Sequence, residues 1–256
     1  MIVTERINSI GVVRLHRPDS RNALTGEMLR ELTTAMLNFD RDPDIRVIVL
    51  TGSDPAFCAG LDLRDLANIY NGAVADPETP PVAMRSLMPL TVTPIIGAIN
   101  GAAVTGGLEL ALGCDFLIAS ERATFADTHA RVGIMPAGGM TIRLPQLVGV
   151  NRARQMSLTG NFISATTANE WGLVNEVVDH GNLMTRVVEV ATAIAECDPA
   201  AVTYLRSMYA DLAHRSDPEV YRDEARRSRT WMKEKFSSEH LDAQREQIIQ
   251  RGRSQQ

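Results

Sequence analysis

The chain has 256 residues, which is enough for one large domain or for one domain with a small appendage. A hydrophobic share of 45% and a charged share of 22% are ordinary for a globular protein and exclude extensive disorder. The formal net charge is -5 and no long basic run is present, which argues against a nucleic-acid-binding protein.

The first residues predict strands and one amphipathic helix. Residues 2–6 and 10–16 are β-like runs separated by two polar residues, a spacing typical of a hairpin. Thr25 is placed to cap a helix, because apolar residues follow it at helical spacing as far as Asp42. Residues 47–50 are apolar and β-branched, as expected of a parallel strand buried on both faces.

The middle of the chain repeats one pattern of strand, glycine-rich loop and helix. A loop at 52–60 and a helix from Asp62 follow the first buried strand, and a further loop is expected at 71–81. The pattern then returns, in this order: a strand at 94–99, a loop at 100–107, a helix at 108–112 and a strand at 115–119. This alternation predicts an α/β fold with parallel strands.

The last part of the chain changes character. From about Leu183 the sequence predicts helices only, and Asp-Pro pairs separate them. We therefore expect a boundary near Gly181, with a core at 1–181 and a C-terminal helical region at 182–256.

Cysteines and apolar runs indicate the compartment. Cys58, Cys114 and Cys197 are far apart and have no metal-ligand spacing, so we expect reduced thiols, no metal site and a cytoplasmic protein. The N-terminal segment carries charges and has no apolar core, unlike a signal peptide. The longest weakly polar stretch, 94–104, is too short and glycine-rich to span a bilayer, and no membrane partner is expected.

Two loop–helix junctions are candidates for a binding site. They are residues 56–62 and 100–109, and each directly follows a predicted buried strand. Ligands of open α/β sheets bind beyond the carboxyl ends of the strands, and glycines allow backbone N–H groups to approach a ligand. Two such N–H groups could share one carbonyl oxygen and form an oxyanion hole. The alternative is that both junctions are only tight turns and helix caps.

Glu109 is the acid of most interest. It lies one turn into an apolar helix, where burial would raise its pKa and make it a better general base. The alternative is a carboxylate that serves the dipole at the helix N-terminus.

The order of several short motifs resembles the enoyl-CoA hydratase/isomerase (crotonase) family. The matching segments are Arg21-Asn22-Ala23-Leu24, Phe57-Cys58-Ala59-Gly60-Leu61-Asp62, Asn100-Gly101 with Gly106-Gly107-Leu108-Glu109-Leu110, Val132-Gly133-Ile134-Met135-Pro136-Ala137-Gly138-Gly139, Ile163-Ser164-Ala165 and Trp171-Gly172-Leu173-Val174. Each motif is weak alone, but their order along residues 1–200 is specific.

The resemblance implies a fold, a substrate and an assembly. The expected fold is a crotonase-like spiral of ββα units followed by a helical region, and the expected assembly is a homotrimer or a dimer of trimers. The substrate would be an acyl-CoA thioester, so coenzyme A arrives with the substrate and no cofactor is permanently bound.

The resemblance also implies roles for particular residues. The backbone N–H groups of Ala59 and Gly106 would hold the thioester oxygen, and Ala59, Gly60, Leu61 and Asp62 with Gly106 would line the substrate groove. Glu109 matches the first catalytic glutamate of the hydratases.

One position departs from the family pattern. Where the hydratases have a second glutamate, alignment on Phe125 places His129, with Asp127 as a poorer stand-in because its position does not match. A histidine can donate or accept a proton near neutral pH, so His129 is the predicted second catalytic group. The alternative is that His129 is a packing or surface residue.

These observations predict a 2-enoyl-CoA hydratase that acts in the breakdown of fatty or branched acids and stabilises an enolate. Two alternatives remain open at this point. One is an enoyl-CoA isomerase or related lyase that uses Glu109 alone, and the other is a non-catalytic acyl-CoA-binding protein.

Overall fold

The computed structural model describes residues 1–65, 84–85, 87–212 and 219–235. It divides the chain into two compact units, Met1–Thr203 and Tyr204–Gln256. The loop predicted at 71–81 and most of the helix predicted from Asp62 lie outside the described residues.

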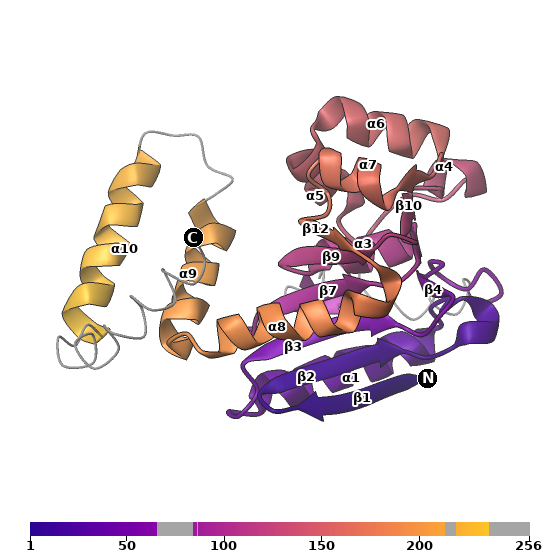
Figure 1. The fold of residues 1–256 in the computed structure, drawn as a ribbon. Coiled ribbons are helices and arrows are strands. Elements are labelled where there is room, and N and C mark those ends of the chain that lie inside the picture. The colour runs from indigo at the N-terminus through magenta and orange to yellow at the C-terminus, as the bar shows by residue number, and fades with distance from the viewer. Residues whose placement is uncertain (66–83, 86, 213–218, 236–256) are drawn as a thin grey trace. The chain divides into compact units, whose positions relative to one another are not determined.

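A six-stranded sheet forms the centre of the first unit (Figure 1). In spatial order its strands are β1 (Ile2–Ile7), β2 (Ile10–Leu15), β3 (Val47–Gly52), β7 (Ile95–Ile99), β9 (Phe116–Ser120) and β12 (Glu176–Val178). The first two strands pair antiparallel with Ile7 opposite Ile10, which confirms the predicted hairpin. All other neighbours in this sheet are parallel, because helices or second strands connect them.

Both faces of this sheet are covered, and the alternation along the strands explains why. In β3, Val47 and Val49 face one apolar cluster while Ile48 and Leu50 face the other. Helix α8 (Leu183–Ala195) lies across the first face, and α1 (Gly26–Arg41) packs on the opposite one (Figure 1). The two central strands β3 and β7 are therefore buried throughout, as parallel strands covered on both sides require.

The predicted N-terminus of α1 is confirmed. Thr25 is the cap residue, and its hydroxyl accepts a hydrogen bond from the Met28 N–H at 3.2 Å.

A second, smaller sheet lies beyond the ends of the central strands. Its order is β11 (Ile163–Ser164), β10 (Thr124–Ala126), β8 (Ala102–Val104) and β4 (Ala56–Cys58). The last three strands pair parallel. Along the chain β4 follows β3, β8 follows β7 and β10 follows β9, so each of these strand pairs contributes one strand to each sheet. This repeated strand–strand–helix unit confirms the predicted spiral. The expectation of plain loops at 52–60 and 100–107 is wrong, since each contains a strand of the second sheet.

The remaining elements complete the first unit. They are η1 (Pro18–Ser20), the β5–β6 pair (Met84–Arg85 and Met88–Pro89), α3 (Gly106–Gly113), α4 (His129–Val132), α5 (Met140–Val148), α6 (Val150–Thr159), α7 (Ala165–Glu170) and η2 (His180–Asn182).

The helical part of the chain begins where expected but divides later. Helices α8, α9 (Pro199–Leu212) and α10 (Glu219–Lys235) follow one another, as predicted. The boundary between the compact units is at Thr203 and not near Gly181, because α8 packs on the central sheet through Leu183, Val187 and Ala191.

Candidate active site

Asn22 holds the connection between β3 and β4 and the start of β4. Its side chain is fully buried, and its amide nitrogen lies 2.7 Å from the carbonyls of Ser53 and Ala56 and 3.2 Å from that of Phe57. Its carbonyl oxygen accepts the Arg17 N–H at 2.8 Å. One amide thus binds the β3–β4 connection to the segment before α1, although 31 to 35 residues separate them along the chain.

The N–H of Ala59 is not directed at a ligand. It donates to the Arg21 carbonyl at 3.0 Å, so the expectation that Ala59 holds the thioester oxygen is wrong. The turn continues through Gly60, whose φ of 100° is open to glycine without strain. The carbonyl of Gly60 then accepts from Leu24, and the N–H of Asp62 donates to Leu24.

Leu61 and Gly106 carry the backbone N–H groups that meet at this place. A Cβ built on Gly106 would lie 3.4 Å from the Leu61 nitrogen, and one built on Gly60 would lie 3.4 Å from the Gly106 nitrogen. Gly106 is the first residue of α3, where N–H groups have no partner within the helix. Among the described residues, neither N–H has a hydrogen-bond acceptor.

Gly107 allows α3 to approach β4 this closely. A Cβ on Gly107 would lie 2.1 Å from the Cys58 carbonyl oxygen, so any side chain would push the helix away from the turn. Cys58 is itself fully buried, and this burial raises the pKa of its thiol to about 12.

Glu109 is buried one turn further along α3, with 3% of its surface exposed. Its Oε1 accepts the N–H of Gly138 at 2.7 Å and that of Met140 at 3.4 Å. Burial raises the pKa of this carboxyl above its ordinary value, although the two N–H groups and His129 oppose the shift. A Cβ on Gly138 would stand 2.8 Å from the carboxyl carbon, so a glycine is needed there.

His129 faces Glu109 from the first residue of α4. Its Nε2 lies 3.9 Å from Glu109 Oε2, and only 5% of the residue is exposed. Its Nδ1 lies 2.6 Å from the Asp127 Oδ1, and that carboxylate is also buried. The structure thus joins Glu109, His129 and Asp127 in one buried cluster, and it excludes a surface position for His129.

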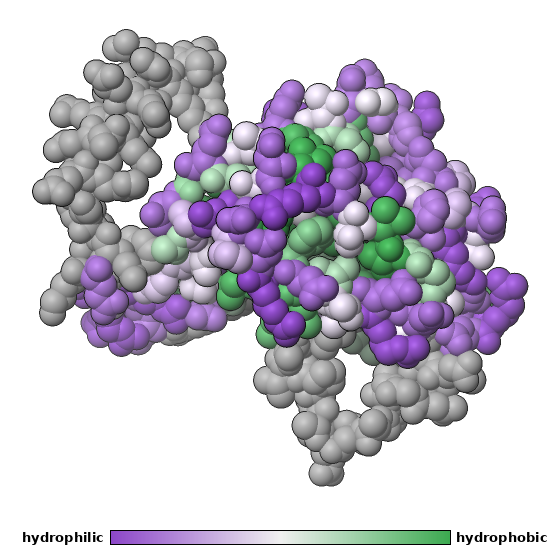
Figure 2. Space-filling model, turned by 90° about the horizontal axis from the view of Figure 1, so that it is seen from below, coloured by the Kyte–Doolittle hydropathy of each residue, from purple (hydrophilic) through white to green (hydrophobic). Residues whose placement is uncertain are grey.

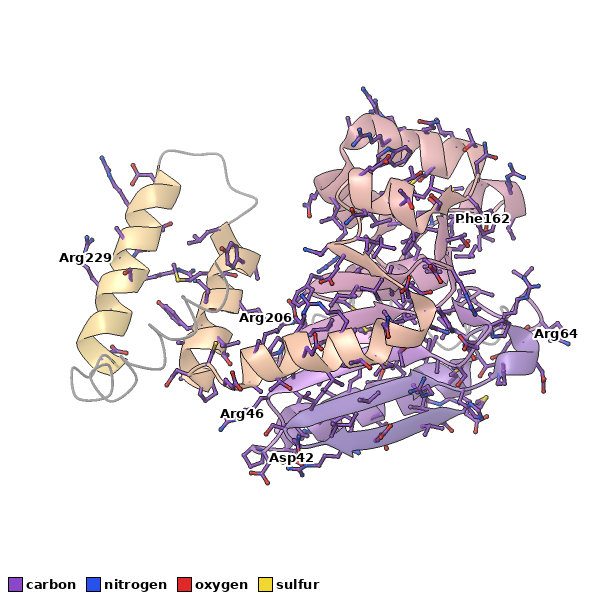
Figure 3. The ribbon with its side chains drawn as sticks, in the orientation of Figure 1. Asp42, Arg46, Arg64, Phe162, Arg206 and Arg229 are labelled. Atoms are coloured by element: carbon purple, nitrogen blue, oxygen red, sulfur yellow. The ribbon has the colours of Figure 1, made fainter. Side chains whose placement is uncertain are left out.

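Asp62 is placed at the edge of a polar cavity and not inside the cluster. Its carboxylate pairs with Arg17 at 2.8 Å, which lowers the pKa of that carboxyl. The cavity has a volume of about 610 Å³, and Arg30 and Arg64 also line it. Figure 3 shows Arg64 pointing outward from this edge of the fold.

Sequence reasoning missed three contributors. Asn22 lies in a quoted motif, but no role was expected for it. Leu61 was expected only to line the groove, and Asp127 was expected to be a poor stand-in for a catalytic acid. The Asp-Thr-His spacing directly after a strand was the available signal for the Asp127–His129 pair.

The geometry defines a class of site. Two backbone N–H groups without acceptors among the described residues, close to a buried carboxyl and an imidazole, can stabilise negative charge on a carbonyl oxygen and move protons at neighbouring carbons.

The comparisons give the family. A family model described as enoyl-CoA hydratase/isomerase matches residues 5–248, and the chain belongs to this family. It is 41% identical to a probable peroxisomal enoyl-CoA hydratase 1 of Arabidopsis thaliana over 209 residues, which cover 82% of this chain and 78% of the relative. The predicted crotonase-like fold is thereby confirmed.

Solved structures agree. The crystal structure of an enoyl-CoA hydratase from Mycobacterium tuberculosis H37Rv has 46% sequence identity and a TM-score of 0.74, with 83% of this chain and 90% of that chain covered. The enoyl-CoA hydratase of Bacillus anthracis is 31% identical with a TM-score of 0.84, and 96% of both chains is covered.

Proposed function

We propose that this protein is a 2-enoyl-CoA hydratase that acts in the breakdown of fatty or branched acids. The observation that carries the proposal is the buried pair of Glu109 and His129, 3.9 Å apart, next to the N–H groups of Leu61 and Gly106. Relatives named as enoyl-CoA hydratases support it, since they match most of the chain.

The reaction divides between the two parts of the site. The thioester oxygen accepts hydrogen bonds from the N–H groups of Leu61 and Gly106, which stabilise the enolate formed when water adds to the β-carbon. One such donor is worth about 3 kcal/mol in an acyl-transfer enzyme. Glu109 and His129 form the acid–base pair, and the positive end of α3 adds to the field at the oxyanion.

The arginine-lined cavity suits the rest of the substrate. Arg17, Arg30 and Arg64 line a cavity of about 610 Å³ next to the Leu61–Asp62 turn, together with Glu27, Asp62 and Asp65. Asp62 pairs with Arg17 and Arg64. We infer that these guanidinium groups meet the phosphates of coenzyme A when the substrate binds. Coenzyme A is then part of the substrate, and the proposal requires no permanently bound cofactor.

Assembly and location complete the proposal. No helix among the described residues has the length and apolarity needed to cross a membrane. We propose a homotrimer or a dimer of trimers, because large apolar side chains are exposed along α4, α6 and the turn before β11. A cytoplasmic location remains a prediction from the sequence.

A screen of purified protein against 2-enoyl-CoA and 3-enoyl-CoA thioesters of several chain lengths tests the activity. We expect loss of the conjugated double bond in crotonyl-CoA, followed by absorbance. The Glu109→Gln variant should lose about 100-fold or more in kcat, since general acid–base groups contribute this much. Binding of the CoA ester should stay nearly intact, because the glutamine side chain retains an oxygen that accepts from the Gly138 N–H.

Glu170→Gln provides the matched control, because Glu170 is exposed at the end of α7. Undiminished turnover in Glu109→Gln would contradict the site assignment. Isomerisation of 3-enoyl-CoA with negligible hydration would replace the hydratase by an isomerase. Tight binding without turnover of any thioester would replace both by an acyl-CoA-binding protein.

A further inference from the structure

Asp127 is a buried carboxylate to which the proposed acid–base pair assigns no task. It has 1% of its surface exposed and lies at the point where the chain leaves β10 and enters α4. A carboxylate in such a place is costly unless its charge is compensated. Its partners therefore indicate why it is there.

The partners of Asp127 all favour the ionised carboxylate. Its Oδ1 accepts the backbone N–H of His129 at 3.2 Å and lies 2.6 Å from the ring Nδ1 of the same residue. The Ser157 hydroxyl of α6 is a further hydrogen-bond partner. Burial alone would raise the pKa of this carboxyl, but these hydrogen bonds outweigh burial and hold the pKa below its ordinary value.

An ionised Asp127 determines which ring nitrogen of His129 carries the proton. A carboxylate can only accept, so the proton must lie on Nδ1, and Nε2 is then left with its lone pair. That lone pair faces Glu109, because Nε2 lies 3.9 Å from Oε2. This distance is too long for a direct hydrogen bond but suits a water molecule that contacts both groups.

We propose that Asp127 is a positioning residue for hydration, which holds His129 so that Nε2 accepts the proton of the water that adds to the β-carbon. This rests on the proposed function. The water O–H bond breaks as the C–O bond forms, and the electrons of the double bond move through the α-carbon to the thioester oxygen. In this proposal Glu109 begins the step as the carboxylic acid and then transfers its proton to the α-carbon. Proton transfer from His129 back to Glu109 restores the starting state.

This assignment reverses the expectation for Glu109, which becomes the acid while His129 becomes the base. The charged groups around the imidazole are consistent with it. Asp127 and Glu109 are the acids in contact with His129. Arg131 of α4 is occupied elsewhere, since its guanidinium donates to the Thr159 carbonyl and to Asn161. From α6, Ser157 contributes a neutral hydroxyl.

The test compares kcat and KM of Asp127→Asn and wild type in hydration of crotonyl-CoA. The asparagine side chain keeps an acceptor for the His129 N–H but cannot stabilise the imidazolium that forms during the reaction. We expect kcat to fall about 100-fold or more, since loss of the corresponding aspartate in a serine protease costs about 10⁴-fold. KM should stay within about threefold, because no substrate contact is lost.

Asp54→Asn is the matched control. Asp54 also pairs with a histidine, since its Oδ2 lies 3.1 Å from Nε2 of His180. Its side chain is 62% exposed, and no ion pair among the described residues joins Asp54 or His180 to Glu109. This variant should leave kcat and KM unchanged. An Asp127→Asn enzyme with the kcat of wild type would overturn the proposal, and the proposed hydratase activity would still stand.

Nitrogen-15 NMR of the imidazoles gives a readout that needs no activity and no variant. Neutral His129 of the wild type should show a protonated Nδ1 and an unprotonated Nε2, because Nδ1 lies 2.6 Å from the Asp127 carboxylate. A proton on Nε2 would overturn the proposal even if Asp127→Asn failed to fold. Absence of turnover of every enoyl thioester by wild type would instead remove the proposed function, and the NMR result would still decide the position of the proton.

Discussion

At the residue scale, the buried position of Glu109 links its protonation to the stability of the fold. Its carboxyl is buried under the Gly138–Met140 turn, and burial raises its pKa. The folded state therefore holds the proton to higher pH than the unfolded chain, in which the pKa of a glutamate is about 4.3. Stability from this group is fully present below the unfolded value and is lost as pH rises above it.

Glu109→Gln should consequently gain stability where it loses activity. We expect the midpoint of thermal unfolding to rise by about 2 °C or more relative to wild type at pH 8, since 1 kcal/mol corresponds to roughly this shift in a domain of this size. The gain should shrink at pH 5. Scanning calorimetry at both pH values measures it. Glu31→Gln should show no such gain, because the N-terminal ammonium lowers the pKa of Glu31.

The sequence was enough to predict the acid–base side chains of the site but not the backbone N–H groups of the oxyanion hole. Glu109 and His129 were predicted as a pair, and the structure brings them together. Whether Ala59 or Leu61 donates to the thioester oxygen depends on which of the two N–H groups is already bonded to the Arg21 carbonyl. The local sequence does not contain that information. The role of Asn22 depends on carbonyls more than 30 residues away along the chain.

At the scale of elements, one short contact joins the two halves of the site. Thr105 directly precedes Gly106 and has a φ of 54° and a ψ of -111°, which is strained for a β-branched residue. Its hydroxyl makes a short hydrogen bond to that of Thr128 and accepts the Thr128 N–H at 3.2 Å. Since Thr128 is the residue before α4, the contact connects the start of α3 to the helix that carries His129.

Thr128→Val should loosen this connection while keeping the branched shape of the side chain. We expect a loss of about 1 kcal/mol in the free energy of unfolding, as for one hydrogen bond. Turnover of crotonyl-CoA should fall more than affinity for it. Urea unfolding and steady-state kinetics measure the two effects. Thr34→Val, which removes an exposed hydroxyl bonded to the Arg30 carbonyl, should affect stability alone. Equal kinetics in both variants would contradict the proposed connection.

The elements that sequence reasoning missed share a physical cause. Strands β4, β8 and β10 have three residues each, too few for alternation to stand out from a loop. They are also rich in alanine, which has little preference for strands. In the central sheet, β3 was predictable because burial on two faces selects a continuous β-branched run, whereas the three-residue strand β12 was missed as well.

At the scale of the whole molecule, a cluster of exposed apolar side chains along one stretch of the chain marks a candidate contact surface. Among the described residues between Val132 and Phe162, seven large apolar side chains are exposed: Val132, Met135, Ile142, Leu147, Val150, Leu158 and Phe162. Phe162 projects from the outer part of this region in Figure 3. Figure 2 shows that hydrophobic residues also reach the surface between hydrophilic ones on the side seen from below.

Leu158→Lys should therefore weaken self-association. Sedimentation velocity of the wild type should give three or six protomers, and the variant should shift toward smaller species because a charge would be buried at the contact. Val92→Lys, at an exposed valine outside this region, should sediment as wild type. A wild type that sediments as a monomer at every concentration would contradict the proposed assembly.

The close packing of α3 against Cys58 affects how the cysteines of this protein react with oxidants. A thiol with a pKa of about 12 has almost no thiolate at neutral pH, and thiolate is the form that peroxides and alkylating agents attack. Cys197 is instead exposed, beyond the end of α8. Electrophiles would thus react first at a position separate from the turn that holds the thioester, and the turnover machinery would be spared.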